Sequence, residues 1–383
     1  MTTPVLELDG VTKRFGSMTA VNDVSLSVAE GELVCLLGPS GCGKSTTLRS
    51  VAGFETPDDG AVRIEGRDVT ATPPNERPCT MVFQNWALFP NKTVQENVAF
   101  GLKMAGVSER ERHERAAELL SLVEMSEQAD ARPEELSGGQ KQRTALARSL
   151  APDPDLLLLD EPLSNLDRKL REAMQLEIKE IQATLGTTMV YVTHDQDEAF
   201  TLADRIGVMN DGRLVQTGPP SDVYTDPDDR FVESFLGTTN FVECTVAPAE
   251  TPQRKPSADG GLADDRVPLE TPLGSSLAAP ASDDLEPGDR VTASLRPERL
   301  SVSVDTDADA NTADDPGAFA ARATVENVLH RGSTVRYELT VGDATLFTER
   351  RMADRLDVEP GDAVMVRCGS RDVSYFGPAG ARV

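Results

Sequence analysis

Apolar runs alternate with helical patterns over about the first 235 residues of the chain. Three runs have the length and unbroken hydrophobicity of buried strands: ELVCLL (residues 32–37), DLLLLD (155–160) and TMVYVTH (188–194). Runs without polar alternation are typical of a parallel sheet that is covered on both faces. The first run leads through a glycine-rich loop into the helical pattern KSTTLRSVAG. The pattern therefore predicts an α/β domain with a central, largely parallel sheet.

A helical stretch interrupts this alternation between residues 93 and 150. Its clearest part, SERERHERAAELLSLVEM (residues 108–125), repeats apolar residues at the spacing of one helix face. We therefore expect a helical subdomain of about residues 88–152 inserted into the α/β domain, which we place at residues 1–236.

The pattern changes after Gly237. Residues 248–288 are rich in Pro, Ala, Gly and Asp with little periodicity, which predicts mobile loops or an expanded linker. A second acidic loop, DTDADANTADDPG, starts at Asp305. Short strand patterns surround these loops: DRVTASLRPERLSV, AARATVENVLH, STVRYELTV and DAVMVRC. Residues 237–383 are thus expected to form a small all-β domain, a barrel of the OB-like kind, with acidic and Pro-rich insertions.

The charge balance narrows the possible functions. The chain has 38 Lys and Arg against 64 Asp and Glu, a formal net charge of −26. Broad binding to nucleic acid needs cationic surface, so we expect no nucleic-acid partner. An acidic surface with little Lys is typical of proteins from a high-salt, halophilic cytoplasm, where counterions screen self-repulsion. An ordinary acidic protein is the alternative.

Other features bear on compartment and metal chemistry. No apolar run approaches the roughly 18 residues of a membrane span, and the first residues, MTTPVLELDG, lack the pattern of a signal peptide. We expect a soluble, cytoplasmic protein that reaches a membrane only through a partner. The five cysteines have no zinc or redox spacing, which predicts reduced, mostly buried thiols.

The glycine-rich loop carries the clearest chemistry. GPSGCGKST matches the phosphate-loop pattern G-x-x-x-x-G-K-[ST] and lies between a strand and a helix, as that mechanism requires. Its backbone N–H groups can surround a β-phosphate, Lys44 can contact the β- and γ-phosphates, and the Ser45 hydroxyl can ligate Mg²⁺. The residues predicted to bind the phosphates are Gly38, Pro39, Ser40, Gly41, Cys42, Gly43, Lys44, Ser45 and Thr46.

Polar residues follow the other buried strands on the side where α/β sheets bind ligands. Asp160 ends LLLLD and is a candidate Mg²⁺ ligand, while Glu161 beside it can polarise a water for attack on the γ-phosphate. His194 ends TMVYVTH, and its position beside the other strand ends favours a catalytic role over a structural one. Gln84 follows the strand TMVF and can contact Mg²⁺ or the attacking water.

These motifs together resemble those of the ATP-binding cassette (ABC) ATPases. The phosphate loop, Gln84, LSGGQ (residues 136–140), LLLLDEP, SNLD (164–167) and His194 occur in the order found in that family, over about residues 5–236. LSGGQ is highly specific to it. The resemblance implies a P-loop NTPase fold, ATP and Mg²⁺ as ligands, and ATP hydrolysis.

The resemblance also implies a head-to-tail homodimer. In the family, the signature residues Ser137, Gly138 and Gly139, followed by Gln140, close over the γ-phosphate held by the partner's phosphate loop. The dipole and N–H groups at a helix start suit an added anion, whereas a simple N-cap accounts for Ser137 but not for the whole segment. Asp167 matches the residue that links the two ATP sites; SNLD stands here for the family's usual SALD.

The resemblance to the family extends to Phe15 and to residues 85–94. Phe15 matches the aromatic residue that stacks on adenine, although a core aromatic explains it equally well. The segment NWALFPNKTV (residues 85–94) matches the surface that receives a helix from a membrane subunit, with Trp86 and Asn91 in place of the more common Tyr and His.

The last part of the chain indicates the subclass. ASLRPERLSV and VENVLHRGSTVRYEL resemble the accessory TOBE-like barrel of importer ATPases, which implies a regulatory role for residues 237–383. The implied partners are two integral membrane permease subunits and, indirectly, an extracellular solute-binding protein, with the chain peripheral at the cytoplasmic face of the membrane. AGFETPDDG, PPNERPCTMVFQNWALFP and TNFV look most like the polyamine, ferric-iron and phosphonate branch of these importers. That resemblance implies a polyamine (spermidine/putrescine), ferric iron or phosphonate as the solute. A sugar or glycerol-phosphate importer, and a soluble non-transport ABC ATPase, are the alternatives.

Overall fold

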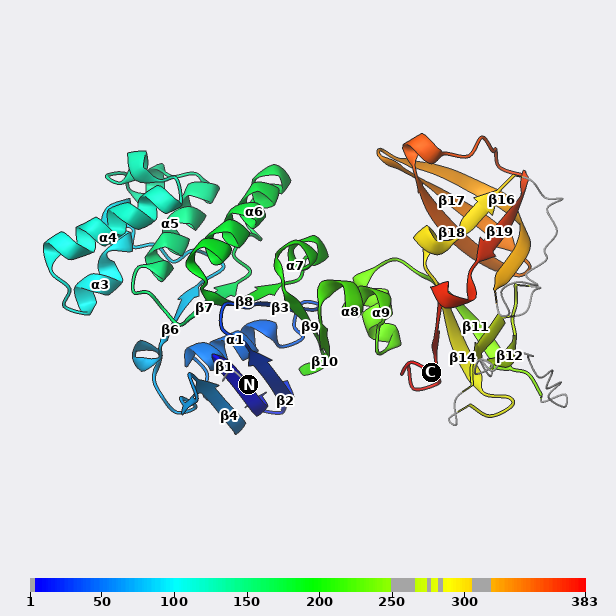
Figure 1. The fold of residues 1–383 in the computed structure, drawn as a ribbon, viewed down its shortest axis with the longest axis horizontal. Coiled ribbons are helices and arrows are strands. Elements are labelled where there is room, and N and C mark those ends of the chain that lie inside the picture. Colours follow the sequence, from blue (N-terminus) through cyan, green and yellow to red (C-terminus); the bar gives the residue numbers. More distant parts are fainter. Residues whose placement is uncertain (1–3, 249–265, 274–276, 282–284, 305–317) are drawn as a thin grey trace, which may run out of the picture. The chain divides into compact units, whose positions relative to one another are not determined.

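The computed structural model describes residues 4–248, 266–273, 277–281, 285–304 and 318–383. The chain separates into two compact units, Met1–Asp226 and Pro227–Val383 (Figure 1). Among the described residues, none of the helices combines the length and the hydrophobicity that a bilayer crossing requires. All five cysteines are free thiols, four of them buried, as the sequence predicts.

A six-stranded sheet forms the centre of the first unit. Its strands follow the order β10-β9-β3-β8-β7-β6. Every neighbouring pair from β9 to β6 is parallel, and β10 is antiparallel to β9. The predicted parallel sheet is confirmed, and the three apolar runs are β3, β7 and β8, whose residues are all buried. The strands are β3 (Leu33–Leu37), β6 (Cys79–Val82), β7 (Leu156–Asp160), β8 (Thr188–Thr193), β9 (Arg205–Asn210) and β10 (Arg213–Gly218).

A second, antiparallel sheet was not expected from the sequence. Its strands follow the order β2-β1-β4-β5, with bounds β1 (Leu6–Phe15), β2 (Met18–Val28), β4 (Asp59–Ile64) and β5 (Arg67–Asp68). Helix α1 (Lys44–Ala52) contributes Leu48 and Val51 to a hydrophobic core that also contains residues of both sheets. The helix that follows the glycine loop is therefore held on both sides by buried apolar packing.

The helical stretch lies beyond strand β6 (Figure 1). Ser108 caps the predicted amphipathic helix, α4, and Ser137 caps α5. Helix α5 contacts both α2 and α4. The helices here are α2 (Val94–Val98), α3 (Phe100–Met104), α4 (Glu109–Leu122) and α5 (Gly138–Leu150). The rest of the unit adds α6 (Arg168–Leu185), α7 (Gln196–Leu202) and α8 (Pro220–Thr225).

The described residues of the second unit form strands, apart from its first helix, α9 (Arg230–Leu236), short 3₁₀ turns and connecting loops. Two antiparallel five-stranded sheets, β13-β12-β11-β14-β20 and β15-β19-β16-β17-β18, share one hydrophobic core. The first sheet contains β11 (Asn240–Val246), β12 (Arg266–Glu270), β13 (Leu277–Pro280), β14 (Arg290–Leu295) and β20 (Val373–Phe376). The second contains β15 (Ser301–Ser303), β16 (Phe319–Arg331), β17 (Thr334–Val341), β18 (Ala344–Arg351) and β19 (Ala363–Cys368).

Part of the region predicted to be loops forms strands in the structure. The prediction of loops throughout residues 248–288 is wrong at β12 and β13, which pair with each other and join β11. Residues 249–265, 274–276 and 282–284, like the predicted acidic loop at 305–317, lie outside the described residues.

The two units separate before α9, whereas residues 1–236 were expected to form the first domain. Glu233 on α9 is almost completely buried and accepts hydrogen bonds from Arg296 (2.7 Å) and Ser294 (2.5 Å). A buried carboxylate needs partners of this kind. The pairing therefore fixes α9 to the strands of the second unit.

Candidate functional site

The glycine loop follows β3 and ends at the first turn of α1, as predicted. A Cβ atom placed on Gly38 would lie 2.3 Å from the carbonyl oxygen of Met209, and one on Gly43 would lie 2.3 Å from that of Ala20. Gly43 also has φ 105°, a conformation that favours glycine. Both glycines are thus required by close backbone packing around the loop.

Hydrogen bonds fix the side chains of Lys44 and Ser45, the residues predicted to contact the phosphates and the metal. The Lys44 ammonium donates to the carbonyl oxygens of Gly38 (2.7 Å) and Pro39 (2.9 Å), so its charge lies inside the loop. The Ser45 hydroxyl donates to Oδ1 of Asp160 at 2.7 Å. Burial raises the pKa of Asp160, and the hydrogen bond from Ser45 opposes that rise. A hydroxyl and a carboxylate are oxygen ligands of the kind that Mg²⁺ prefers, so these residues fit the ion.

Glu161, Gln84 and His194 lie together beside this pair. Oε2 of Glu161 lies 3.3 Å from His194 Nδ1 and 3.4 Å from Gln84 Nε2. The structure thus brings together three strand-end residues that lie far apart in the sequence. Glu161 adopts φ 44°, the left-handed region, directly after strand β7. Such strained positions cluster at functional sites, and a carboxylate next to a histidine can activate water.

Ser164 and Asn165, two residues that were not predicted to belong to the site, support these groups. Ser164 receives a hydrogen bond from Gln84 (3.3 Å) and donates to the carbonyl oxygen of Glu161 (2.9 Å). Asn165 donates to the carbonyl oxygen of Gln84 at 3.0 Å. The sequence did contain a sign of this contact, because Asn165 replaces the Ala of the family's usual SALD pattern.

A buried network fixes the end of β8 next to His194. Glu198 accepts hydrogen bonds from Tyr191 and Thr193, both at 2.8 Å. Burial raises the pKa of Glu198, while the hydrogen bonds from Tyr191 and Thr193 oppose that rise. Arg171 pairs with Asp195 at 3.1 Å. These contacts hold the backbone that presents His194.

The signature segment starts helix α5 with a capping box. The Ser137 hydroxyl accepts from the N–H of Gln140 (3.3 Å), and the Gln140 side chain accepts from the N–H of Ser137 (2.9 Å). Asp167 caps α6 by accepting from the N–H of Leu170 at 3.1 Å. Ser137 is exposed, whereas Gly139 is buried. Among the described residues, no hydrogen bond joins Ser137, Gly138 or Gly139 to the phosphate loop of the same chain.

Comparisons with known proteins agree with these motifs. Residues 21–164 match the ABC transporter family, and residues 293–376 match the TOBE domain. The spermidine/putrescine import ATP-binding protein PotA of Rubrobacter xylanophilus is 44% identical over 374 residues, which cover 97% of this chain and 93% of the relative. The chain belongs to the ATP-binding proteins of ABC transporters. This family ATPase therefore has the predicted P-loop NTPase fold, followed by a barrel-like TOBE domain.

A further relative and a solved structure support the assignment to this family. PotA of Thermobifida fusca is 46% identical to this ABC ATPase over 346 residues, 89% of this chain and 85% of the relative. A solved structure of the ATP-binding cassette MJ0796, a dimer in a post-hydrolysis state bound to ADP and Pi, is 34% identical with a TM-score of 0.51. That match covers 56% of this chain and 98% of the solved one.

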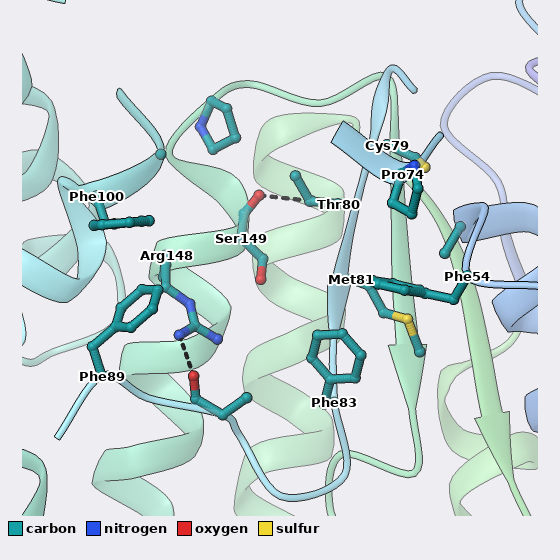
Figure 2. A pocket seen from close by; sticks show the side chains of 14 residues that line it. Phe54, Pro74, Cys79, Thr80, Met81, Phe83, Phe89, Phe100, Arg148 and Ser149 are labelled. Atoms are coloured by element: carbon teal, nitrogen blue, oxygen red, sulfur yellow. Dashed lines mark hydrogen bonds between the residues drawn. The ribbon is translucent and has the colours of Figure 1, made fainter. Parts of the chain in front are cut away.

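An aromatic groove of about 470 Å³ lies next to the Gln84 loop (residues 84–89) of this ABC ATPase. Figure 2 shows its walls, with Phe54 and Phe83 on one side and Phe89 and Phe100 on the other. Among the described residues that line it, Arg148 alone carries a charge. Only part of the expected segment, residues 85–94, lines the groove, since helix α5 and strand β6 supply other walls.

Phe15 is 43% exposed at the end of β1, with the Lys13 ammonium 5.3 Å from the ring centre. A core role for Phe15 is therefore wrong. Stacking on adenine stays a prediction.

Proposed function

We propose that this ABC ATPase is the energising subunit of a polyamine importer. Glu161 activates the water that attacks the γ-phosphate, His194 and Gln84 position the reacting groups, and Ser45, Asp160 and Gln84 would hold Mg²⁺. The carrying observation is that Gln84 Nε2 and His194 Nδ1 both lie within 3.4 Å of Glu161 Oε2, beside the Ser45–Asp160 pair. Bound Mg²⁺ would neutralise phosphate charge during hydrolysis.

The proposal includes a head-to-tail homodimer. Ser137, Gly138 and Gly139 complete the partner's ATP site, and Asp167 links the two sites. The exposed position of Ser137 at the start of α5 supports this role, since free helix-start N–H groups suit an anion. ATP binding closes the dimer and hydrolysis opens it.

Two membrane permease subunits are the proposed partners, with an extracellular solute-binding protein acting through them. The aromatic groove supports this part, because a cavity lined by four Phe side chains suits an amphipathic helix from another chain. The chain would then be peripheral at the cytoplasmic face of the membrane. The second unit, with its TOBE match, would regulate the cycle.

Spermidine or putrescine is the proposed solute. Support comes from relatives named spermidine/putrescine import ATP-binding proteins, which are 40–48% identical to this chain. The test is uptake of labelled spermidine by cells or vesicles containing the chain with its membrane subunits and binding protein. ATP-dependent uptake that is lost in Glu161→Gln supports the proposal. Uptake of maltose or glycerol phosphate instead would favour the alternative importer, and failure to copurify with membrane proteins would favour a soluble ATPase.

Head-to-tail contact has its own test. In a cysteine-free background, Ser40→Cys and Ser137→Cys are combined with Glu161→Gln and oxidised with and without MgATP. A disulfide forms only when Cα atoms come within about 7 Å. We expect an ATP-dependent covalent dimer on a denaturing gel. A crosslink formed only within single chains would overturn the head-to-tail model.

A further inference from the structure

Side chains from two other segments hold the backbone of the Gln84 loop. Asn165 donates to the carbonyl oxygen of Gln84 at 3.0 Å. The guanidinium of Arg148, on helix α5, donates to the carbonyl oxygens of Trp86 (2.8 Å) and Ala87 (2.7 Å). One arginine thus holds two successive peptide groups just after the residue predicted to contact Mg²⁺ or the attacking water.

The two peptide groups held by Arg148 are in an unfavourable conformation. Trp86 has φ 60° and Ala87 has φ 46°, both in the left-handed region. Such strained residues persist only where the surroundings fix them. A planar guanidinium with a fixed fork of donors is suited to fixing two carbonyl groups at once. Arg148 therefore has a specific task in shaping this loop.

Among the described residues, Arg148 is held by carbonyl groups and an aromatic ring and not by a carboxylate. Its guanidinium lies over the ring of Phe89 at 5.6 Å, at the edge of the aromatic groove (Figure 2). In the part of the chain that the structure describes, no carboxylate pairs with it, and burial lowers its pKa. A half-buried cation loses part of its hydration, and the hydrogen bonds to Trp86 and Ala87 compensate for that loss.

The same loop also contacts the other end of α5. A Cβ placed on Gly138 would lie 3.8 Å from the Trp86 ring, and the Lys141 ammonium lies 6.0 Å from the ring centre. Helix α5 therefore contacts the loop near its start through the Trp86 ring and near its end through Arg148. The signature segment and the Gln84 loop are joined at two points.

Buried polar groups near this junction lack protein partners. The Trp86 indole N–H and both amide atoms of Gln142, one helical turn after Gly138, make no hydrogen bond to the described residues. Native structures leave few such groups, and each calls for an explanation.

We propose that Arg148 is a positioning residue that locks the Gln84 loop to helix α5, so that both move as one body. This inference rests on the proposed function, in which Gln84 helps to hold Mg²⁺ and to position the reacting groups at the bound nucleotide. When Gln84 moves, Arg148 and the Trp86 ring carry the signature segment of the same chain with it. Arg148 acts through the Gln84 loop and not directly on the nucleotide or the attacking water.

The test compares Arg148→Met and Arg148→Lys with a matched control, Arg110→Met, on the purified full chain. Arg110 is 81% exposed and lies 3.9 Å from Glu114 on α4, so its loss removes a charge without touching the loop. Trp86 is the only tryptophan of the chain, and its emission reports on the loop directly. The measurements are kcat and KM for ATP, the melting temperature, and the emission change on adding MgATP.

We expect Arg148→Met to lower kcat by about tenfold, equivalent to ~1.4 kcal/mol, with KM changed by less than about threefold because the phosphate loop is untouched. The emission response of Trp86 to MgATP should be lost. Arg148→Lys keeps the charge but not the fork, so it should recover part of kcat. Arg110→Met should match the wild type.

Three outcomes would overturn the inference. One is a lower melting temperature with unchanged kcat and emission response, which would show a purely structural role. Another is a rise in KM that accounts for the whole loss of kcat/KM, with kcat unchanged. The third applies if Arg148→Met does not fold. An Arg148→Lys variant that folds and has the kcat and the emission response of the wild type would then overturn the inference. A wild-type chain that does not hydrolyse ATP would instead refute the proposed function.

Discussion

Gly139 offers a test that separates packing from phosphate contact. A Cβ placed on Gly139 would lie 2.9 Å and 3.0 Å from the two methyl carbons of Leu170 on α6. A contact of that kind typically costs 1–3 kcal/mol, and the better helix propensity of alanine offsets up to about 1 kcal/mol. Gly139→Ala should therefore lose about 0–2 kcal/mol of unfolding free energy. For a unit of this size, the melting temperature should fall by about 2–4 °C per kcal/mol.

The assay pairs thermal unfolding with ATPase rates in four variants. They are Gly139→Ala, Leu170→Ala, the double variant and, for thermal unfolding alone, Gly138→Ala as a milder packing change, since its Cβ would lie 3.2 Å from a single methyl carbon of Leu166. If Leu170 alone makes alanine costly at position 139, the double variant should be more stable than the sum of the single changes predicts. If the glycine also approaches the partner's phosphate, the ATPase rate should stay depressed by more than about tenfold despite that recovery.

Two results would refute this reasoning. A Gly139→Ala variant more stable than the wild type would show that α5 and α6 adjust freely, and that the packing argument is wrong. A double variant that regains both stability and the full ATPase rate would restrict Gly139 to helix packing. The proposed phosphate contact across the dimer would then lose one of its residues.

Glu161→Gln should leave ATP binding intact but nearly abolish turnover, since an amide cannot activate water; a normal steady-state rate would exclude the assigned role. Lys44→Ala should weaken nucleotide binding, measured by equilibrium titration, because a cation beside the phosphates is lost; unchanged affinity would contradict this. A chain ending before Pro227 should bind ATP and stay monodisperse by size-exclusion chromatography. One ending after Leu236 should aggregate more, since it exposes α9 and leaves Glu233 without Arg296. The melting temperature should fall from molar to low salt, because a net charge of −26 repels itself; a constant value would remove the high-salt hypothesis.

The sequence predicted those parts of the fold that depend on local pattern. The strands that carry Asp160 and His194, and the loop before Lys44, are continuous motifs whose neighbours in sequence are also their neighbours in space. Strands β12 and β13 were missed because their short segments, rich in Pro and Ala, become strands only by pairing with each other and with β11. The antiparallel sheet β2-β1-β4-β5 was likewise set by long-range pairing.

In the candidate site too, residues marked by a local pattern were predicted, whereas a residue whose role depends on distant contacts was missed. Glu161, Gln84 and His194 could be selected because each follows a strand, and the structure brings them together. Arg148 gave no such signal, since an arginine inside a helical pattern is expected to be a solvated charge. Its role depends on two carbonyl groups about sixty positions earlier in the chain. Single-sequence patterns contain no information on which backbone groups a side chain will meet at that separation.

The left-handed backbone of Glu161 has a consequence for anyone who selects variants of this protein. At φ 44° a side chain with a Cβ is strained, whereas glycine adopts the conformation freely and asparagine tolerates it better than most residues. Replacing the proposed general base by glycine or asparagine should therefore yield a chain that melts higher and hydrolyses no ATP. A screen that rewards expression or heat resistance alone would enrich such inactive chains. Engineering at this position must select for turnover and stability together.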